Sequence, residues 1–269
     1  MIRLLKIELK KILPYRTFWV LTGLYFLLLS LFFMGLRGVL SGIKINQPKQ
    51  PLNIADKFNI PLYDFPDIWH NLAFVAGFFK IILAIVILIL ITNEFSYKTI
   101  RQHIITGFSR LDFLLAKLGL IFSLSVGVTV FIFLLGLIIG LFNSGVTEIH
   151  LMVGKLEFVL VYFLEVFSYL IFALFIGTLV KKSGLSIGLL LLYTVIIEPI
   201  IGYILPDVIS PYMPLSSISN LIQVPNNSLM SLFGLHFQNY ISAIDVSIAI
   251  AYAFVFIAAI YWLLKKRDL

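Results

Sequence analysis

The chain has 269 residues, of which 61% are hydrophobic and 12% are charged, and its formal net charge is +7. Its mean hydropathy is +1.06, and since a soluble domain carries roughly 25% charged residues, this composition excludes an ordinary soluble protein and indicates an integral membrane protein. The absence of cysteine excludes disulfides, thiolate nucleophiles and Cys-ligated zinc. The cations gather at the ends of apolar segments, so they indicate membrane orientation, and no nucleic-acid partner is predicted.

The first predicted element is an amphipathic helix over residues 1–17. One face carries apolar residues and another carries cations, a pattern typical of a helix lying in the membrane interface. The apolar set is Ile2, Leu5, Leu9, Ile12 and Leu13, and the cationic set is Arg3, Lys6 and Lys10. Pro14 ends or bends this helix. The alternative is a merely positive tail that sets topology; a cleavable signal is disfavoured because no small-x-small site follows.

Six segments are long and apolar enough to cross a bilayer core of ~30 Å, which takes about 20 residues per helix. These are 18–36, 72–92, 113–142, 156–180, 185–205 and 244–264. No internal repeat of 20 to 50 residues interrupts them. We therefore expect an all-α integral membrane protein in which residues 1–269 form a single transmembrane domain.

Lysine and arginine are concentrated in four stretches that the six spans place on one side of the membrane: 1–17, 93–112, 181–182 and 265–267. The positive-inside rule puts these stretches, and hence both termini, in the cytoplasm. On the outer side, residues 206–242 contain no Lys or Arg, and prolines divide them into apolar pieces too short to span. Such pieces are typical of helices that lie at the outer surface or re-enter the bilayer.

The loop 93–112 between the second and third spans is patterned like two helices with a break between them. Ser96 is predicted to cap a short helix over 97–105, which Gly107 would end. Ser109 and Asp112 form a capping-box pattern that starts the next helix. An ordinary helical hairpin turn is the alternative.

This loop resembles the one that follows the second span in type-2 ATP-binding-cassette (ABC) exporter permeases. The shared pattern is Glu-x-x-x-x-Thr-Ile-Arg followed by Gly-x-Ser-Arg-x-x-x-x-x-x-Lys, and the matching residues are Glu94, Thr99, Ile100, Arg101, Gly107, Ser109, Arg110 and Lys117. Lys98 and Phe108 stand where that family usually has Gly and Pro. Six spans, cytoplasmic termini, an amphipathic N-terminal helix and re-entrant helices between spans five and six are features of the same family, so the resemblance covers the whole chain.

The resemblance implies that residues 93–112 are a coupling loop seated on a separate ABC ATPase. Two ATPase copies and two permeases, with this chain paired to a second copy or to a related permease through spans one and five, would form an exporter in a bacterial inner membrane. ATP and Mg²⁺ would be bound by the ATPase, because this chain has no Gly-x-x-x-x-Gly-Lys-Ser/Thr motif and is not expected to be an enzyme. The family's cargoes include peptides, lipids, glycans and drugs; the apolar interior favours an amphipathic, lipid-like or peptide cargo. Membrane lipid is the remaining expected partner, and no cofactor is expected on this chain.

Three charged residues, Lys80, Glu165 and Glu198, fall at a similar depth within spans two, four and five. Each costs about 2.5 to 3.5 kcal/mol or more in lipid, so we expect them to face the protein interior or water. They either line or gate an outward cavity, or Lys80 pairs with one carboxylate, first Glu165 and then Glu198. Glycine pairs in spans three and five, Gly136 with Gly140 and Gly184 with Gly188, predict close helix approach.

Two other functions compete with an exporter permease. One is a non-transport membrane scaffold or carrier. The other is a rhomboid-type intramembrane serine protease, since Gly184-Leu185-Ser186-Ile187-Gly188 matches Gly-x-Ser-x-Gly and Asp207 and His236 follow in hydrolase order. The protease is disfavoured because the motif begins a helix on one side of the membrane and His236 lies on the other, out of proton-transfer range. The four histidines show no metal-ligand spacing, so no metal site is predicted.

Overall fold

The computed structural model describes residues 2–42, 44–47, 50–53, 63–97, 99, 107, 109–144, 148–206, 208–225 and 240–266. Within these ranges six helical segments are long and apolar enough to cross a membrane. They are Arg16–Gly35, Asp67–Ser96, Arg110–Phe142, Ile149–Val180, Ser183–Ile204 and Ala243–Lys266. Each overlaps one predicted span, so the chain is a helical, multi-pass membrane protein.

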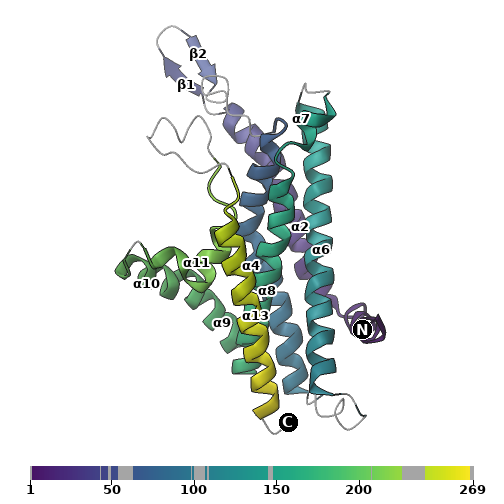
Figure 1. Cartoon of the computed structure of the whole chain (residues 1–269). Helices are drawn as coiled ribbons and strands as arrows, with labels where there is room; N and C mark the ends of the chain where they lie inside the picture. Colours follow the sequence, from purple (N-terminus) through teal and green to yellow (C-terminus); the bar gives the residue numbers. More distant parts are fainter. Residues whose placement is uncertain are drawn as a thin grey trace.

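Five long helices form an upright bundle (Figure 1). They are α2 (Arg16–Gly42), α4 (Asp67–Ser96), α6 (Arg110–Asn143), α8 (Glu157–Val180) and α13 (Ala243–Lys266). Helix α8 is central because it packs against α4, α6 and α13. Its window contains the largest share of buried residues among the six candidate spans. The apolar core therefore gathers around α8.

The bundle has two ends, which we name by what they carry. At the loop end lie the end of α4, the start of α6 and the end of α13; at the hairpin end lie β1, β2 and the short helix α7 (Ile149–Val153) (Figure 1). Strand β1 (Lys44–Gln47) pairs antiparallel with β2 (Gln50–Asn53), with Lys44 opposite Asn53. The all-α expectation is thus correct for the bundle but missed this hairpin, whose four-residue strands are too short for a clear alternating pattern.

Helix α4 begins at Asp67, several residues before the predicted span. Its first turns are polar, but their side chains have partners: the Trp69 indole donates to the Met152 carbonyl at 2.7 Å, and a His70 ring nitrogen lies 2.8 Å from the Gln223 carbonyl. Lys155 donates to Asp67 at 2.6 Å. A prediction from hydropathy assigns these polar residues to a loop. It cannot take account of the hydrogen-bond partners, which are distant in the sequence.

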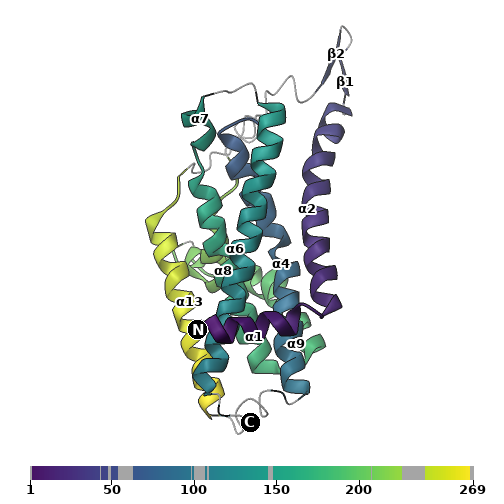
Figure 2. The same cartoon turned by 90° about the vertical axis from the view of Figure 1, so that its right-hand side faces the viewer.

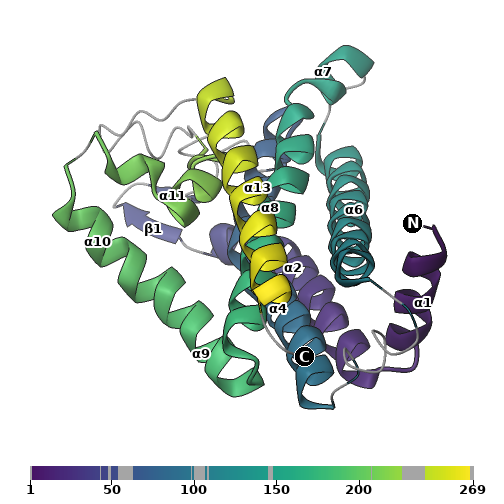
Figure 3. The same cartoon turned by 60° about the horizontal axis from the view of Figure 1, so that its bottom comes forward.

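The fifth span is interrupted and leaves the bundle obliquely (Figures 1 and 3). Helix α9 (Ser183–Leu192) passes through a π-helical turn, η1 (Tyr193–Ile197), into α10 (Glu198–Ile204). Pro199 lacks the N–H that would continue the α-helical ladder, which accounts for irregular backbone directly before it. The 3₁₀ turn η2 (Ser210–Tyr212) and α11 (Pro214–Ser219) follow, and α11 packs against α13 and α8.

The two glycine pairs behave differently. A Cβ at Gly136 would lie 2.6 Å from the Trp69 ring, and one at Gly140 would lie 2.3 Å from the Phe65 ring. The close approach predicted for this pair is therefore confirmed. At Gly184 and Gly188 a Cβ would meet no atom within 4 Å among the described residues of this chain.

Candidate functional site

Four charged side chains from three helices meet near the loop end, and we call them the ion cluster: Glu8, Lys11, Glu94 and Lys117. The Lys117 ammonium lies 2.6 Å from Glu8 and 2.7 Å from Glu94. The Lys11 ammonium lies 3.1 Å from Glu94 and 3.3 Å from Glu8. Glu8 and Lys11 belong to α1 (Ile2–Ile12), which crosses the face of α6 (Figure 2). The cluster thereby ties α1 to α4 and α6.

The ion cluster is charge-balanced and largely removed from solvent. The side chains of Lys117 and Glu8 are 4% and 5% exposed, whereas that of Lys11 is 34% exposed. Burial raises the pKa of Glu8, but Lys117 and Lys11 outweigh it, and the pKa ends below its ordinary value. Burial lowers the pKa of Lys11, but Glu94 and Glu8 outweigh it, and the pKa ends above its ordinary value. Both groups are therefore ionised at neutral pH.

Polar contacts extend the ion cluster along the end of α4. The Asn93 amide donates to the Tyr15 hydroxyl at 2.9 Å, and the Thr99 hydroxyl donates to the Glu94 carbonyl at 3.2 Å. Tyr15 and Thr99 also line an open cavity of about 240 Å³ beside the cluster. The segment between α1 and α2 is thus attached to the same helix end as α1 itself.

The structure confirms how α6 begins. Gly107 has φ of +92°, a conformation that suits the predicted helix stop. The Ser109 hydroxyl accepts from the Asp112 N–H at 3.0 Å, and the Asp112 carboxylate accepts from the Ser109 N–H at 3.1 Å, which is the predicted capping box. The Arg110 guanidinium donates to the Lys265 carbonyl, joining the start of α6 to the end of α13.

The prediction that Ser96 caps a new helix is wrong. Ser96 is the last residue of α4, and its hydroxyl donates to the Thr92 carbonyl at 3.0 Å, as a serine inside a helix does. Helix α4 continues beyond the apolar residues of span two, through Glu94 and Phe95 to Ser96. Ser96 therefore ends this helix and does not start another. Ile100, Arg101 and nearly all of the predicted helix 97–105 lie outside the described residues.

Lys117 and Glu94, two of the residues predicted for ATPase coupling, are buried in the ion cluster, with side-chain exposures of 4% and 12%. They join helices within the chain. Sequence reasoning missed their partners Glu8 and Lys11. The one signal was an acidic residue within an otherwise basic amphipathic helix.

Lys80 pairs with Glu165, the partner that sequence reasoning ranked first. The ammonium lies 2.5 Å from the carboxylate, and both side chains are buried. The same ammonium lies 3.4 Å from the Ser219 hydroxyl and 5.2 Å from the centre of the Tyr169 ring. Gly77 makes room for the pair, since a Cβ there would lie 3.0 Å from the Glu165 carboxylate. The pair connects α4, α8 and the end of α11.

Glu198 has a different partner. Its buried carboxylate accepts from the Ser216 N–H at 2.5 Å and from the Ser216 hydroxyl at 3.0 Å. Helix α11 is therefore held at two points, at Ser216 in its first turn by Glu198 and at its last residue, Ser219, by Lys80. This arrangement favours the structural latch among the two interpretations of the charged layer.

The serine of the hydrolase-like motif lies in a helix. Ser186 is fully buried in α9, and its N–H donates to the Lys182 carbonyl. A nucleophile elbow requires an exposed serine on a sharp strand-to-helix turn. Asp207 and His236 lie outside the described residues.

Residues 52–269 match DUF2705, a family described as a protein of unknown function. The chain belongs to this family. The match includes both Glu94 and Lys117 and all three residues of the charged layer, whereas α1 lies before it. No curated protein matches the chain.

Proposed function

We propose that this DUF2705 protein is the transmembrane permease subunit of an ABC exporter, driven by ATP hydrolysis on a separate ATPase subunit. The loop end faces the cytoplasm of a bacterium, because the cations of the chain gather there and positive charge is retained inside. The loop between α4 and α6 receives the ATPase, and α11 with its neighbouring turns is the re-entrant region between spans five and six.

One observation carries this proposal. Glu94 and Lys117 are the first and last residues of the loop pattern shared with type-2 exporter permeases, and they bind each other at 2.7 Å. This ion pair closes the loop into one unit whose base is fixed to α4, α6 and α1. A movement of the ATPase against the loop would therefore be transmitted to α4, α6 and α1. A loop with a flexible base would bend without moving these helices.

Two copies of this chain are proposed to enclose the transport path. Only 11% of the fifth span's most apolar window is buried in the single chain, against 67% for the fourth span. Its glycines 184 and 188 meet no neighbouring atom in the part of the chain that the structure describes, as expected of small residues at a contact between two copies. Span five is accordingly the proposed contact between copies, together with span one.

The proposed cargo is an amphipathic or lipid-like molecule or a peptide. Apolar side chains dominate the described interior, where Lys80 is paired with Glu165 and the Glu198 carboxylate accepts two hydrogen bonds from Ser216. Such an interior favours cargo that carries its own apolar surface over a hydrophilic ion.

Affinity purification of the tagged chain in mild detergent, followed by identification of the co-purifying subunits, tests the proposal. We expect an ATPase with a Walker motif in amounts equal to the permease. Recovery of the chain with only non-ATPase partners, from cells that express every neighbouring gene, would favour a membrane scaffold or carrier.

A further inference from the structure

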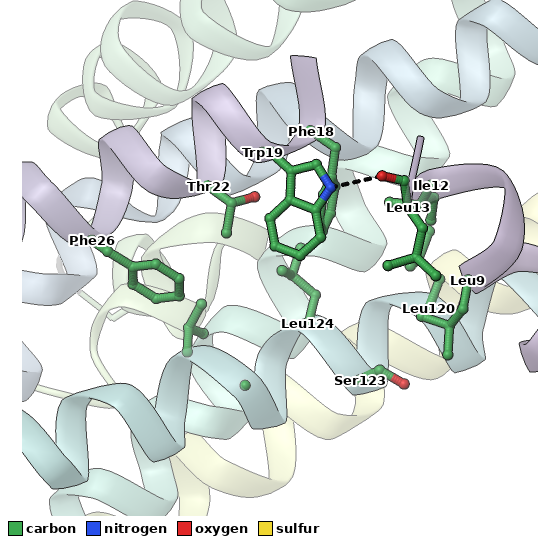
Figure 4. A pocket seen from close by; sticks show the side chains of 12 residues that line it. Leu9, Ile12, Leu13, Phe18, Trp19, Thr22, Phe26, Leu120, Ser123 and Leu124 are labelled. Carbon is green, nitrogen blue, oxygen red and sulfur yellow. Dashed lines mark hydrogen bonds between the residues drawn. The ribbon is translucent and has the colours of Figure 1, made fainter. Parts of the chain in front are cut away.

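A second cavity, of about 270 Å³, lies between α1, α2 and α6 (Figure 4). It is lined almost wholly by apolar side chains. Its volume is just below the roughly 300–1,000 Å³ of pockets that hold drug-sized ligands. A space of this size and polarity suits one hydrocarbon chain rather than a bulky polar molecule.

The cavity has an exposed rim, which includes the corner between α1 and α2 and Gly127 on α6, and a buried wall. Leu13 and Trp19, two lining residues at this corner, are 59% and 54% exposed, whereas Leu124 and Val128 on α6 are buried. Phe26 closes the deep end by packing on Phe131, with ring centres 4.3 Å apart. The shape is a slot that a chain can enter from the side of α1.

A specific hydrogen bond links the two sides of the corner. The Trp19 indole donates to the Leu13 carbonyl at 2.9 Å and spans from α2 to the end of α1 (Figure 4). Tryptophan favours the level of lipid headgroups, where its ring is apolar and its N–H is bonded. The mouth of the slot is thus built for the membrane interface.

Inside the slot, one hydroxyl lacks a partner. Thr22 is 5% exposed, and its Oγ1 is buried with no hydrogen-bond partner among the described residues. A buried hydroxyl without a partner is costly, so an acceptor supplied by a ligand would stabilise it. Thr22 follows Arg16, the first residue of α2, by about 9 Å of helix rise.

Two exposed cations lie on the elements that form the corner. They are Lys10 on α1 and Arg16 at the start of α2. Anionic headgroups are attracted to such juxtamembrane cations by about 1 kcal/mol per Lys or Arg. The exposed cations, the unpartnered Thr22 hydroxyl and the apolar slot all fit one kind of molecule.

We propose that the slot between α1, α2 and α6 binds an anionic phospholipid. One acyl chain lies against Leu124 and Val128, the ester oxygen accepts from the Thr22 hydroxyl, and the headgroup lies between Lys10 and Arg16. The lipid fills the space beneath α1 and so fixes how α1 lies on α6.

Native mass spectrometry of the purified, delipidated chain tests this site without any ATPase, so its outcome is separate from that of the proposed function. The chain is titrated with phosphatidylglycerol or with phosphatidylcholine of the same acyl chains, and the apparent Kd of the first bound lipid is measured. We expect phosphatidylglycerol to bind more tightly than phosphatidylcholine. Equal affinity for the two lipids would overturn the proposal.

Two variants probe the slot itself. Gly127→Leu fills it, because Gly127 lines the slot and a Cβ there would meet none of the described atoms within 4 Å. Displacing several methylenes of the lipid should weaken binding by about tenfold or more. Thr22→Val keeps the shape of the side chain and should weaken binding about fivefold, the effect of one hydrogen bond. Gly23→Leu is the matched control, since Gly23 is equally open but does not line the slot. Unchanged affinity in both Gly127→Leu and Thr22→Val would contradict the assignment.

Discussion

At the scale of single residues, the pair of Lys80 and Glu165 is the most consequential contact within the membrane-spanning part of the bundle. Lys80→Met leaves the Glu165 carboxylate buried beside Gly77 with no cation, a change that typically costs about 3 to 5 kcal/mol. Adding Glu165→Gln should recover part of that loss. Thermal unfolding of the four proteins in one detergent measures this double-mutant cycle. Strictly additive effects of the two substitutions would show that the pair is not coupled.

Gly140 offers a test of close packing between α6 and the start of α4. Gly140→Ala places a Cβ 2.3 Å from the Phe65 ring, so the ring or the helix must shift and the protein should lose stability by about 1 to 3 kcal/mol. Gly23→Ala is the control, because its Cβ meets no atom within 4 Å. That substitution should be neutral or stabilise by up to about 1 kcal/mol. Comparable unfolding temperatures for the two variants would refute the packing described for Gly140.

At the scale of elements, the attachment of α1 should depend on pH. The pKa of Glu8 is lowered in the folded protein. The stability that Glu8 contributes to the folded state is therefore fully present above its ordinary pKa of about 4.3 and is lost as the pH falls through the lowered value. The pKa of Lys11 is raised, so its contribution is lost only as the pH rises past about 10.4 and through the raised value. We therefore expect α1 to stay attached around neutrality and to loosen in acid.

A nitroxide on a single cysteine at the exposed position Lys10 reports this motion, and the chain has no other cysteine to interfere. Label mobility should rise below about pH 4.3. In Glu8→Gln the label should already be more mobile at pH 7. A label that is equally immobile in both proteins from pH 7 to about pH 3 would show that the ion cluster does not hold α1.

Local patterns in the sequence predicted the long helices and the start of α6. A membrane span is recognised by the length of its uninterrupted apolar segment, and the capping box of Ser109 and Asp112 involves only residues three apart in the sequence. The first turns of α4 escaped prediction because Trp69 and His70 are satisfied by Met152 and Gln223, far along the chain. The prediction for Ser96 failed for a related reason. A serine is common at the start of a helix, but its hydroxyl can also donate to a carbonyl one turn earlier within a helix, as Ser96 does to Thr92.

The charged residues show the same division. Lys80 and Glu165 could be paired from depth alone, because few partners are available to a charge within a bilayer. Lys117 could not be assigned to Glu8, since Lys117 belongs to the loop pattern and Glu8 to an amphipathic helix 109 residues earlier in the sequence. The sequence singled out Glu94 and Lys117 as candidate site residues. Their partners Glu8 and Lys11 became evident only from the packing of α1 across α6.

At the scale of the whole molecule, the exposed fifth span predicts a second copy. Single cysteines at Leu185 and Val195, which are 63% and 62% exposed, should form crosslinks between copies in the membrane. Val130→Cys on α6 is the control, because it is 49% exposed on a helix outside the proposed contact. Crosslinking at Val130 together with failure at every position tried on span five would remove that span from the interface.

The central claim is that the loop between α4 and α6 receives an ATPase, and a charge reversal tests it most directly. Arg101→Glu is preferred to Arg110→Glu, since Arg110 also bonds to Lys265 and its loss would disturb α13. Lys182→Glu is the matched control, being an exposed cation at the same end of the bundle but in the turn before α9. The ratio of ATPase to permease after affinity purification is compared for the three proteins. The proposal predicts a ratio near that of the wild type for Lys182→Glu and a strongly reduced ratio for Arg101→Glu; equal ratios in all three, or no ATPase in the wild type, would contradict it.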